Sequence, residues 1–202
     1  MSLPSDIDAA FVPNLYAVAA QLNSEPLNLA MSLYMESNIK ASIQNLQGLP
    51  YYGINQMSAA NLHAMGITPE EYLKLPASQQ LCHYVFPFWK SIMAQHHLSQ
   101  LSARDIEWLN YVPAYYVPNA PDDHVIMNSA NPNYNKGFDH GNKGYITAGD
   151  IGTSVANACK GNRWLAIQAA ILAGNPGIVG GVGGALIAIG LGIFLMWKGI
   201  KG

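Results

Sequence analysis

The stretch MSLYMESNIKASIQNLQGLPYYGINQM, residues 31–57, is the one from which the fold and the function of the chain can be approached. Glu36 is the single carboxylate of an apolar helical run, and a glycine turn, Gly53–Met57, follows about 17 residues later. A lone acid in an apolar helix costs free energy unless it is paired or used. Burial also raises the pKa of a carboxyl, as a general acid near neutral pH requires. Glu36 is therefore the candidate catalytic group.

The composition points to one modest domain with an apolar appendage. Of 202 residues, 50% are hydrophobic and 11% are charged, which is less than half the usual charged share of a soluble domain. A net charge of −2 argues against a specific nucleic-acid partner. Cys82 and Cys159 lack metal-ligand spacing, so we expect free buried thiols. The N-terminus lacks the features of a secretory signal.

Helical periodicity and capping residues predict a mostly α fold, and no strand-like alternation is visible. Ser24 and Pro26 predict the start of a helix that carries Glu36 near its C-terminal end. Near the N-terminus we predict a helix over 6–11 after Ser5, a break at Pro13, and a second helix from Leu15. Farther along, a helix over 58–65 should end before Gly66, and the next should begin with a Thr68–Glu71 capping box. We also predict a helix over 77–96 with a kink at Pro87, and one capped by Ser102.

Residues 139–150 have the frame of a calcium loop, with a turn glycine at the sixth position and an acid at the twelfth. Gly141 and Lys143 stand at the third and fifth positions, where calcium loops use Asp or Asn. A lysine in the loop repels a cation. We therefore predict a tight turn with Thr147 capping the next helix, rather than a metal site, and we expect no cofactor.

Residues 177–197 contain no charged side chain and are long enough to cross a bilayer. Trp197 and Lys198 stand where interfacial anchors belong. Small residues recur at a spacing of four, which is typical of packed membrane helices and predicts a homo-oligomer. We expect a transmembrane helix over 176–198, with a buried core hairpin as the alternative. Residues 156–175 form an apolar connector that is too short to span.

The order of several motifs resembles the lysozyme-like lytic transglycosylases. Met35-Glu36-Ser37 followed by Gly53-Ile54-Asn55-Gln56-Met57 is similar to the first two motifs of that family, and closest to a phage-associated branch with E-S-G-G and G-L-I-Q-F-M. The similarity continues over 66–73, 75–85, 121–123 and 135–147, and covers roughly 27–150. The sequence departs from the pattern at Asn38, Ile39 and Asn55, and in the calcium-like loop.

This resemblance implies a lysozyme-like helical domain over 25–155, preceded by an arm over 1–24. Glu36 would be the sole acid and base, cleaving the bond between N-acetylmuramic acid and N-acetylglucosamine with a 1,6-anhydro product. No second acid accompanies Glu36 in the motif, which fits a mechanism with one carboxylate. Ser37 and Gln56 would hold sugar or orient Glu36. Tyr115 or Tyr116 would supply the tyrosine opposite the acid.

The sequence thus predicts a virion-associated, single-pass membrane enzyme that opens peptidoglycan during phage genome entry. Its expected partners are peptidoglycan, a lipid membrane, other virion proteins and further copies of itself. Two alternatives stay open. The first is a structural membrane or pore protein with an inactive lysozyme-like domain. The second is a goose-type hydrolase, which adds water instead of forming the anhydro ring.

Overall fold

Helices carry most of the residues that the computed structural model describes, 2–45 and 48–174, so the predicted mostly α class is confirmed for this part of the chain. The α-helices are α1 (Phe11–Gln21), α2 (Pro26–Ser37), α3 (Ala59–Ala64), α4 (Pro69–Tyr72), α5 (Ala77–Gln80), α6 (Phe86–Gln95), α7 (Ala103–Tyr111), α8 (Ala148–Ala158) and α9 (Gly161–Ala173). The strands are β1 (Tyr51–Tyr52), β2 (Met57–Ser58), β3 (Val125–Asn128) and β4 (Tyr145–Thr147).

Helix α1 runs through Pro13 without a break, so the predicted helix over 6–11 and its end at Pro13 are wrong. Pro13 is the third residue of α1. In the first turn of a helix a backbone N–H has no partner inside the helix, and a proline there costs little. The preceding residues form turns, and the Asp8 carboxylate accepts a hydrogen bond from Ser78 N at 2.9 Å. The N-terminal arm therefore caps α5 from a distant part of the sequence.

Helix α2 places Glu36 in its last turn, as predicted. Its start differs in one respect, because Glu25 is the N-cap residue and makes no capping hydrogen bond with its side chain. The predicted cap, Ser24, instead donates from Oγ to Leu101 O. Ser24 thus fastens the connection before α2 to the connection before α7. Asn38 ends the helix in the left-handed region, with φ of 56°.

Residues 77–95 form one helical run in three parts: α5, a π-helical turn over 81–85, and α6. Pro87, near the start of α6, lacks an N–H and its ring crowds the carbonyl one turn earlier. The wider π turn directly before it leaves room for the ring. The sequence predicts a kink at Pro87, and the helical run is irregular at that point, in the form of a π turn.

Three helix starts follow the capping prediction. Thr68 and Glu71 form the expected capping box at α4, with each side chain bonded to the backbone N–H of the other residue. Ser102 and Asp105 form a second box at α7. Thr147 and Asp150 form a third at α8. These caps depend on residues three positions apart, so the local sequence is sufficient to predict them.

Two short hairpins accompany the helices in the described residues, although no strand-like alternation is visible in the sequence. β1 pairs with β2 in antiparallel register, with Tyr52 opposite Met57. β3 pairs with β4, and the register shifts between Val125 and Met127. Strands of two to four residues are too short for a period-two pattern to stand out. The first hairpin presents the turn that contains Gly53 and Gln56.

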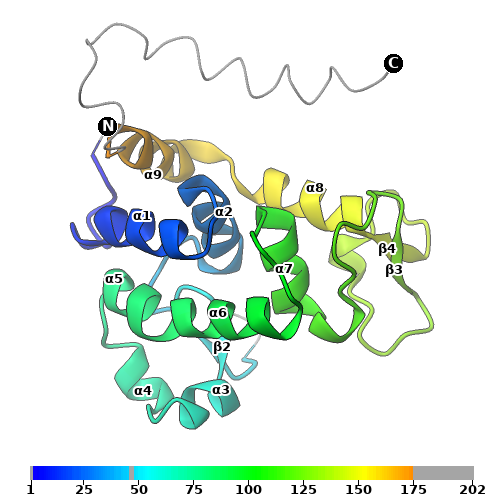
Figure 1. Ribbon diagram of the computed structural model, residues 1–202, viewed down its shortest axis with the longest axis horizontal. Helices are drawn as coiled ribbons and strands as arrows, with labels where there is room; N and C mark the ends of the chain where they lie inside the picture. Colours follow the sequence, from blue (N-terminus) through cyan, green and yellow to red (C-terminus); the bar gives the residue numbers. More distant parts are fainter. Residues whose placement is uncertain (1, 46–47, 175–202) are drawn as a thin grey trace, which may run out of the picture.

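Figure 1 shows α7 standing between the α1–α2 region and the β3–β4 hairpin, with α3 and α4 beyond α6 at the bottom of the view. The main core gathers side chains from most of the helices; its largest members include Phe11, Leu15, Leu29, Leu33, Trp89 and Trp108. A second, smaller cluster lies under α3 and α4 and consists of Met57, Leu62, Ile67 and Tyr72. Cys82 and Cys159 are free and partly buried.

Helix α9 packs into the main core through Trp164, Ile167 and Ile171, and the Trp164 ring lies 5.1 Å from that of Tyr34 on α2. Within residues 2–45 and 48–174, no helix combines the length and the apolar character that a membrane crossing requires. The predicted transmembrane segment, 176–198, lies outside the described residues.

Candidate active site

Three elements that are distant in sequence meet at the carboxyl of Glu36. Asn110, near the end of α7, donates from Nδ2 to Glu36 Oε1 at 3.2 Å. The same nitrogen donates to Asn55 Oδ1, also at 3.2 Å, and Asn55 belongs to the turn between β1 and β2. The amide of Asn110 therefore joins α2, α7 and the first hairpin, and holds the candidate catalytic acid between them.

The electrostatic surroundings of Glu36 favour its protonated form. Burial raises the pKa of Glu36 to about 7, while the hydrogen bond from Asn110 acts in the opposite direction. The position of Glu36 in the last turn of α2 adds to the effect of burial, because the C-terminal end of a helix disfavours a negative charge. A carboxyl with a pKa near 7 can give up a proton and later take one back at neutral pH.

Ser37 connects the two motifs that define the site. Its hydroxyl is buried, lying 2.8 Å from Ile54 O and 3.2 Å from Leu33 O. The first contact links the end of α2 directly to the glycine turn, so Ser37 fixes the turn relative to Glu36. The predicted role of Ser37 in sugar contact remains a prediction, and its two hydrogen bonds are those of a connecting residue.

Gly53 and Gln80 together hold the turn in place. Gln80 is fully buried; its Oε1 accepts from Ile54 N at 3.0 Å, and its Nε2 lies 2.8 Å from Ala41 O and 2.9 Å from Tyr72 O. Gly53 has φ of +71°, and a Cβ there would lie 2.4 Å from Gln80 Oε1. Both the backbone conformation and the close approach of the amide require glycine at this position.

The other predicted contact residues differ in their access to solvent. Gln56, in the left-handed region with φ of 45°, donates from Nε2 to Gly53 O at 3.0 Å and so braces its own turn. Tyr115 is 40% exposed, and its hydroxyl accepts from Asn131 Nδ2. Tyr116 is buried against Trp108, and its hydroxyl donates to Asp105 Oδ1 at 3.1 Å. Tyr115 is thus the better placed of the two to meet a ligand.

A second carboxyl, Glu107 on α7, lies within the electrostatic influence of Glu36, although the sequence offered no acid near the motif. Glu107 is 4% exposed, and Ser32 Oγ on α2 donates to its Oε2 at 3.4 Å. Burial raises the pKa of Glu107 well above its ordinary value, the negative charge of Glu36 raises it further, and the Ser32 hydrogen bond lowers it. The two carboxyls therefore disfavour simultaneous ionisation.

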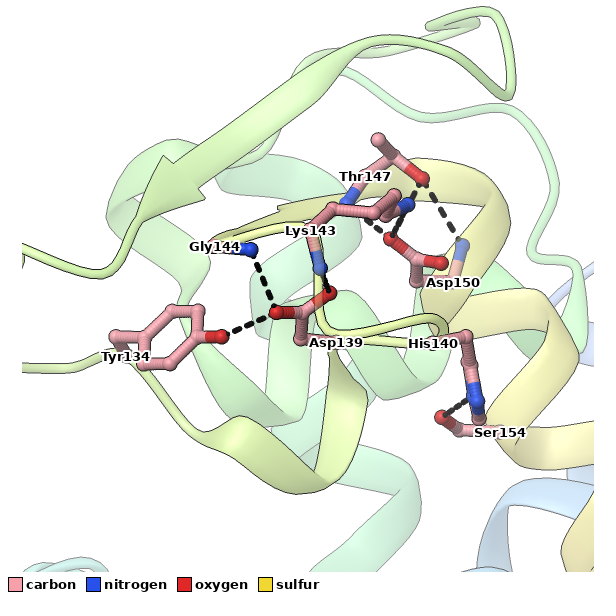
Figure 2. Close-up of polar contacts among 8 residues, drawn as sticks. All are labelled: Tyr134, Asp139, His140, Lys143, Gly144, Thr147, Asp150 and Ser154. Carbon is pink, nitrogen blue, oxygen red and sulfur yellow. Dashed lines mark hydrogen bonds and ion pairs between the residues drawn. The ribbon is translucent and has the colours of Figure 1, made fainter.

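The calcium-like loop contains a cation of its own, the ammonium group of Lys143 (Figure 2). Lys143 Nζ lies 2.7 Å from Asp150 Oδ2. The Asp139 carboxylate accepts from the backbone N–H groups of Lys143 and Gly144 and from the Tyr134 hydroxyl. Across the described ranges no cluster of three or more His, Cys, Asp or Glu side chains is suited to hold a metal ion. The loop is closed by hydrogen bonds and by its lysine.

Two surface cavities lie apart from Glu36. One, of ≈ 300 Å³, is lined by residues that include Ser24, Asn28 and Gln100. The other, of ≈ 320 Å³, lies beside Lys40 and Lys74. Neither is lined by Glu36 or by the predicted contact residues, so the hydrogen bonds around Glu36 define the candidate site.

Comparisons with known proteins leave this site to be interpreted on its own: no family model matches the chain, and no curated protein or solved structure is detectably similar to it. Asn55, Gln80, Glu107 and Asn110 are the site residues that the sequence did not indicate. Glu107 and Asn110 stand three positions apart on α7, and so lie on one face of it. The sequence did contain one signal for them: the helix that buries Ile106 and Leu109 also carries these two polar residues.

Proposed function

We propose that this protein is a peptidoglycan lytic transglycosylase with Glu36 as its single acid and base. The observation that carries the proposal is the Glu36 carboxyl, partly exposed, fixed by the amide of Asn110, with burial raising its pKa to about 7. Such a group is largely protonated just below neutral pH and becomes a competent base once it has given up its proton. The two motifs that resemble the transglycosylase family are joined by the Ser37–Ile54 hydrogen bond.

The proposed reaction needs one carboxyl for both proton transfers. Glu36 protonates the glycosidic oxygen while the bond from that oxygen to C1 of N-acetylmuramic acid breaks, and N-acetylglucosamine leaves with a new hydroxyl. The 6-hydroxyl oxygen of the muramic residue then bonds to C1, and the Glu36 carboxylate takes its proton. The product is a 1,6-anhydro ring, no water is consumed, and Glu36 ends protonated.

The placement of the second carboxyl supports a mechanism with one catalytic acid. Glycosidases that use two carboxylates place both beside the sugar, one of them to activate water or to attack C1. Glu107 is 4% exposed and bonded to Ser32 inside the α2–α7 interface. A carboxyl in that position has too little access to sugar or bulk water, so it cannot activate water or attack C1.

The setting that we propose for the enzyme is the one that the sequence predicts. The apolar segment 176–198 would anchor the protein in a virion or host membrane as a single span, and its small residues would pack against other copies. The domain would act on peptidoglycan during genome entry. Tyr115, with its exposed ring, would contact the glycan chain, and Gln56 would keep the turn beside Glu36 in shape.

Product analysis with the full chain in detergent tests the proposal. Purified peptidoglycan is incubated with the wild type, with Glu36→Gln, and with Glu70→Gln as the matched control, because Glu70 is an exposed glutamate on α4. Mass spectrometry should find anhydro-muropeptides with the wild type and with Glu70→Gln, and at least a 100-fold lower yield with Glu36→Gln. Reducing-end products would instead identify a hydrolase. No release by the folded wild type would reject the enzymatic proposal and favour the structural membrane role.

A further inference from the structure

Glu107 occupies a position where an ionised carboxylate would have no compensating charge. It is 4% exposed, and the hydrogen bond to its carboxyl comes from Ser32, which is itself fully buried. An isolated carboxylate is costly to bury, and such a group ordinarily keeps its proton. Glu36, the other carboxyl acting on this region, adds a like charge when it ionises.

In the described part of the chain, the cationic side chains on and beside α7, α8 and α9 have partners other than Glu107. Arg104 pairs with Asp122, Lys143 with Asp150 and Arg163 with Asp6, while Lys160 Nζ donates to Asn157. The further acid of α7, Asp105, closes the capping box with Ser102. The tyrosines of α1, α2 and α7, which are Tyr16, Tyr34 and Tyr111, and the thiol of Cys159 cannot carry a positive charge. Nothing among the groups named here neutralises a charged Glu107.

Asn110 has an acceptor that lacks a donor. Its Nδ2 donates to Glu36 and to Asn55, but its Oδ1 is buried and has no hydrogen-bond partner. A buried acceptor without a donor is destabilising, because it has lost its hydrogen bonds to water. Glu107 stands three positions earlier on the same face of α7, where side chains are neighbours. A protonated carboxyl is a hydrogen-bond donor, whereas a carboxylate is an acceptor only.

We propose that Glu107 is a positioning residue that works as a neutral carboxylic acid and donates its proton to Asn110 Oδ1. This inference rests on the proposed function, in which Glu36 is the catalytic acid. The donated hydrogen bond orients the Asn110 amide so that its NH₂ group faces Glu36 and Asn55. Glu107 stays protonated while Glu36 gives and regains a proton, so the pair carries one negative charge at most during the cycle.

The first test reads the protonation of Glu107 directly in the full chain in detergent. Carboxyl ¹³C shifts of glutamate-labelled protein, assigned with Glu107→Gln and Glu36→Gln, are followed from pH 4 to 9. The proposal expects the Glu107 signal to remain that of an acid at pH 7, while Glu36 titrates near that pH. A Glu107 signal that is ionised at pH 6 would overturn it. This readout is independent of glycan cleavage, so an inactive wild type would reject the proposed function alone.

The second test separates the hydrogen bond from the packing of the side chain. Glu107→Gln keeps a donor and the size of the group, and should retain kcat within about threefold. Glu107→Leu fills a similar volume without a donor, and should lower kcat at least tenfold with little change in KM. Equal kcat values in folded Gln and Leu variants would overturn the proposal, as would a large loss of kcat in the Gln variant. If the Leu variant fails to fold, the titration and the Gln variant still decide.

Discussion

Asn110 is the residue on which the geometry of Glu36 depends most directly. Replacement by alanine removes the hydrogen bond to Glu36 Oε1 and the bond to Asn55 that ties the turn to α7. Because the Asn110 hydrogen bond lowers the pKa of Glu36, its loss should raise that pKa above about 7. We expect Asn110→Ala to lower kcat by roughly 10- to 100-fold and to move the alkaline limit of activity to higher pH.

The pH dependence of kcat on peptidoglycan checks this expectation. Asn157→Ala is the control, since Asn157 is an exposed asparagine of α8. A fall in kcat without any movement of the alkaline limit would mean that Asn110 supports the fold and does not act on the Glu36 carboxyl.

Gly53 is the second residue with a specific requirement. A Cβ at this position would lie 2.4 Å from Gln80 Oε1 and from Tyr72 Cε1, on a backbone with φ of +71°. Gly53→Ala should destabilise the protein by roughly 2–4 kcal/mol, of which the positive φ accounts for about 1 and the displaced core groups for the rest. Gly66→Ala is the matched control, because φ is +78° there and no atom lies within 4 Å of the added Cβ.

Denaturant unfolding of the two alanine variants compares the two costs. We expect Gly66→Ala to lose about 1 kcal/mol, the cost of the backbone conformation alone. Equal losses at both positions would show that Gln80 and Tyr72 move aside freely, and that the turn is less tightly held than its hydrogen bonds suggest.

At the scale of elements, the sequence best predicts those features of a helix that depend on contacts between residues close in sequence. The Thr68–Glu71 capping box and the place of Glu36 in the last turn of α2 depend on contacts within a few residues. Ser24 was assigned as a helix cap from the same local logic, but a carbonyl 77 positions away takes its hydroxyl. The contribution of Asn110 also comes from a distant helix, and no spacing in the motif could indicate it.

The calcium-like loop, residues 139–150, gives a prediction at the scale of elements. Lys143 Nζ contacts Asp150 and lies 4.8 Å above the ring of Tyr145. Lys143→Met removes the charge and keeps most of the side-chain length, so we expect Tm to fall by roughly 2–6 °C. Lys136→Met, at an exposed lysine of a neighbouring turn, should change Tm by less than about 1 °C.

Calcium provides the complementary measurement. Because the ammonium group of Lys143 already contacts the Asp150 carboxylate, adding millimolar calcium should leave the Tm of the wild type unchanged. A rise in Tm with calcium would show that the lysine gives way to the ion and that the loop is a metal site.

For the molecule as a whole, carboxyls whose pKa values are shifted in opposite directions set the pH of greatest stability. The pKa values of Glu36 and Glu107 are raised, so the folded state binds more protons above the ordinary glutamate pKa. The stabilisation from Glu36 is lost as pH rises from its ordinary value near 4.5 to about 7, and Glu107 acts in the same direction. The pKa values of Asp6, Asp139 and Asp150 are lowered, so their stabilisation is lost as pH falls below their ordinary values near 4. Stability should therefore be greatest at about pH 4 to 5, and should fall as pH rises from there towards 7.

Thermal unfolding across pH 3 to 9 measures this profile. Glu36→Gln should flatten the alkaline side, since a neutral amide has no proton to lose, and should leave the acid side unchanged. An alkaline side of the same slope in wild type and variant would contradict the assignment of that slope to Glu36.

The fit of Gln80 against Gly53 has a consequence for how sequences of this kind can diverge. One amide serves the turn, the segment after α2 and the end of α4, and it does so in space that exists because position 53 has no side chain. A change at either position alone is penalised by the other. We therefore expect positions 53 and 80 to be inherited as a unit in related proteins, with replacements that appear jointly or not at all.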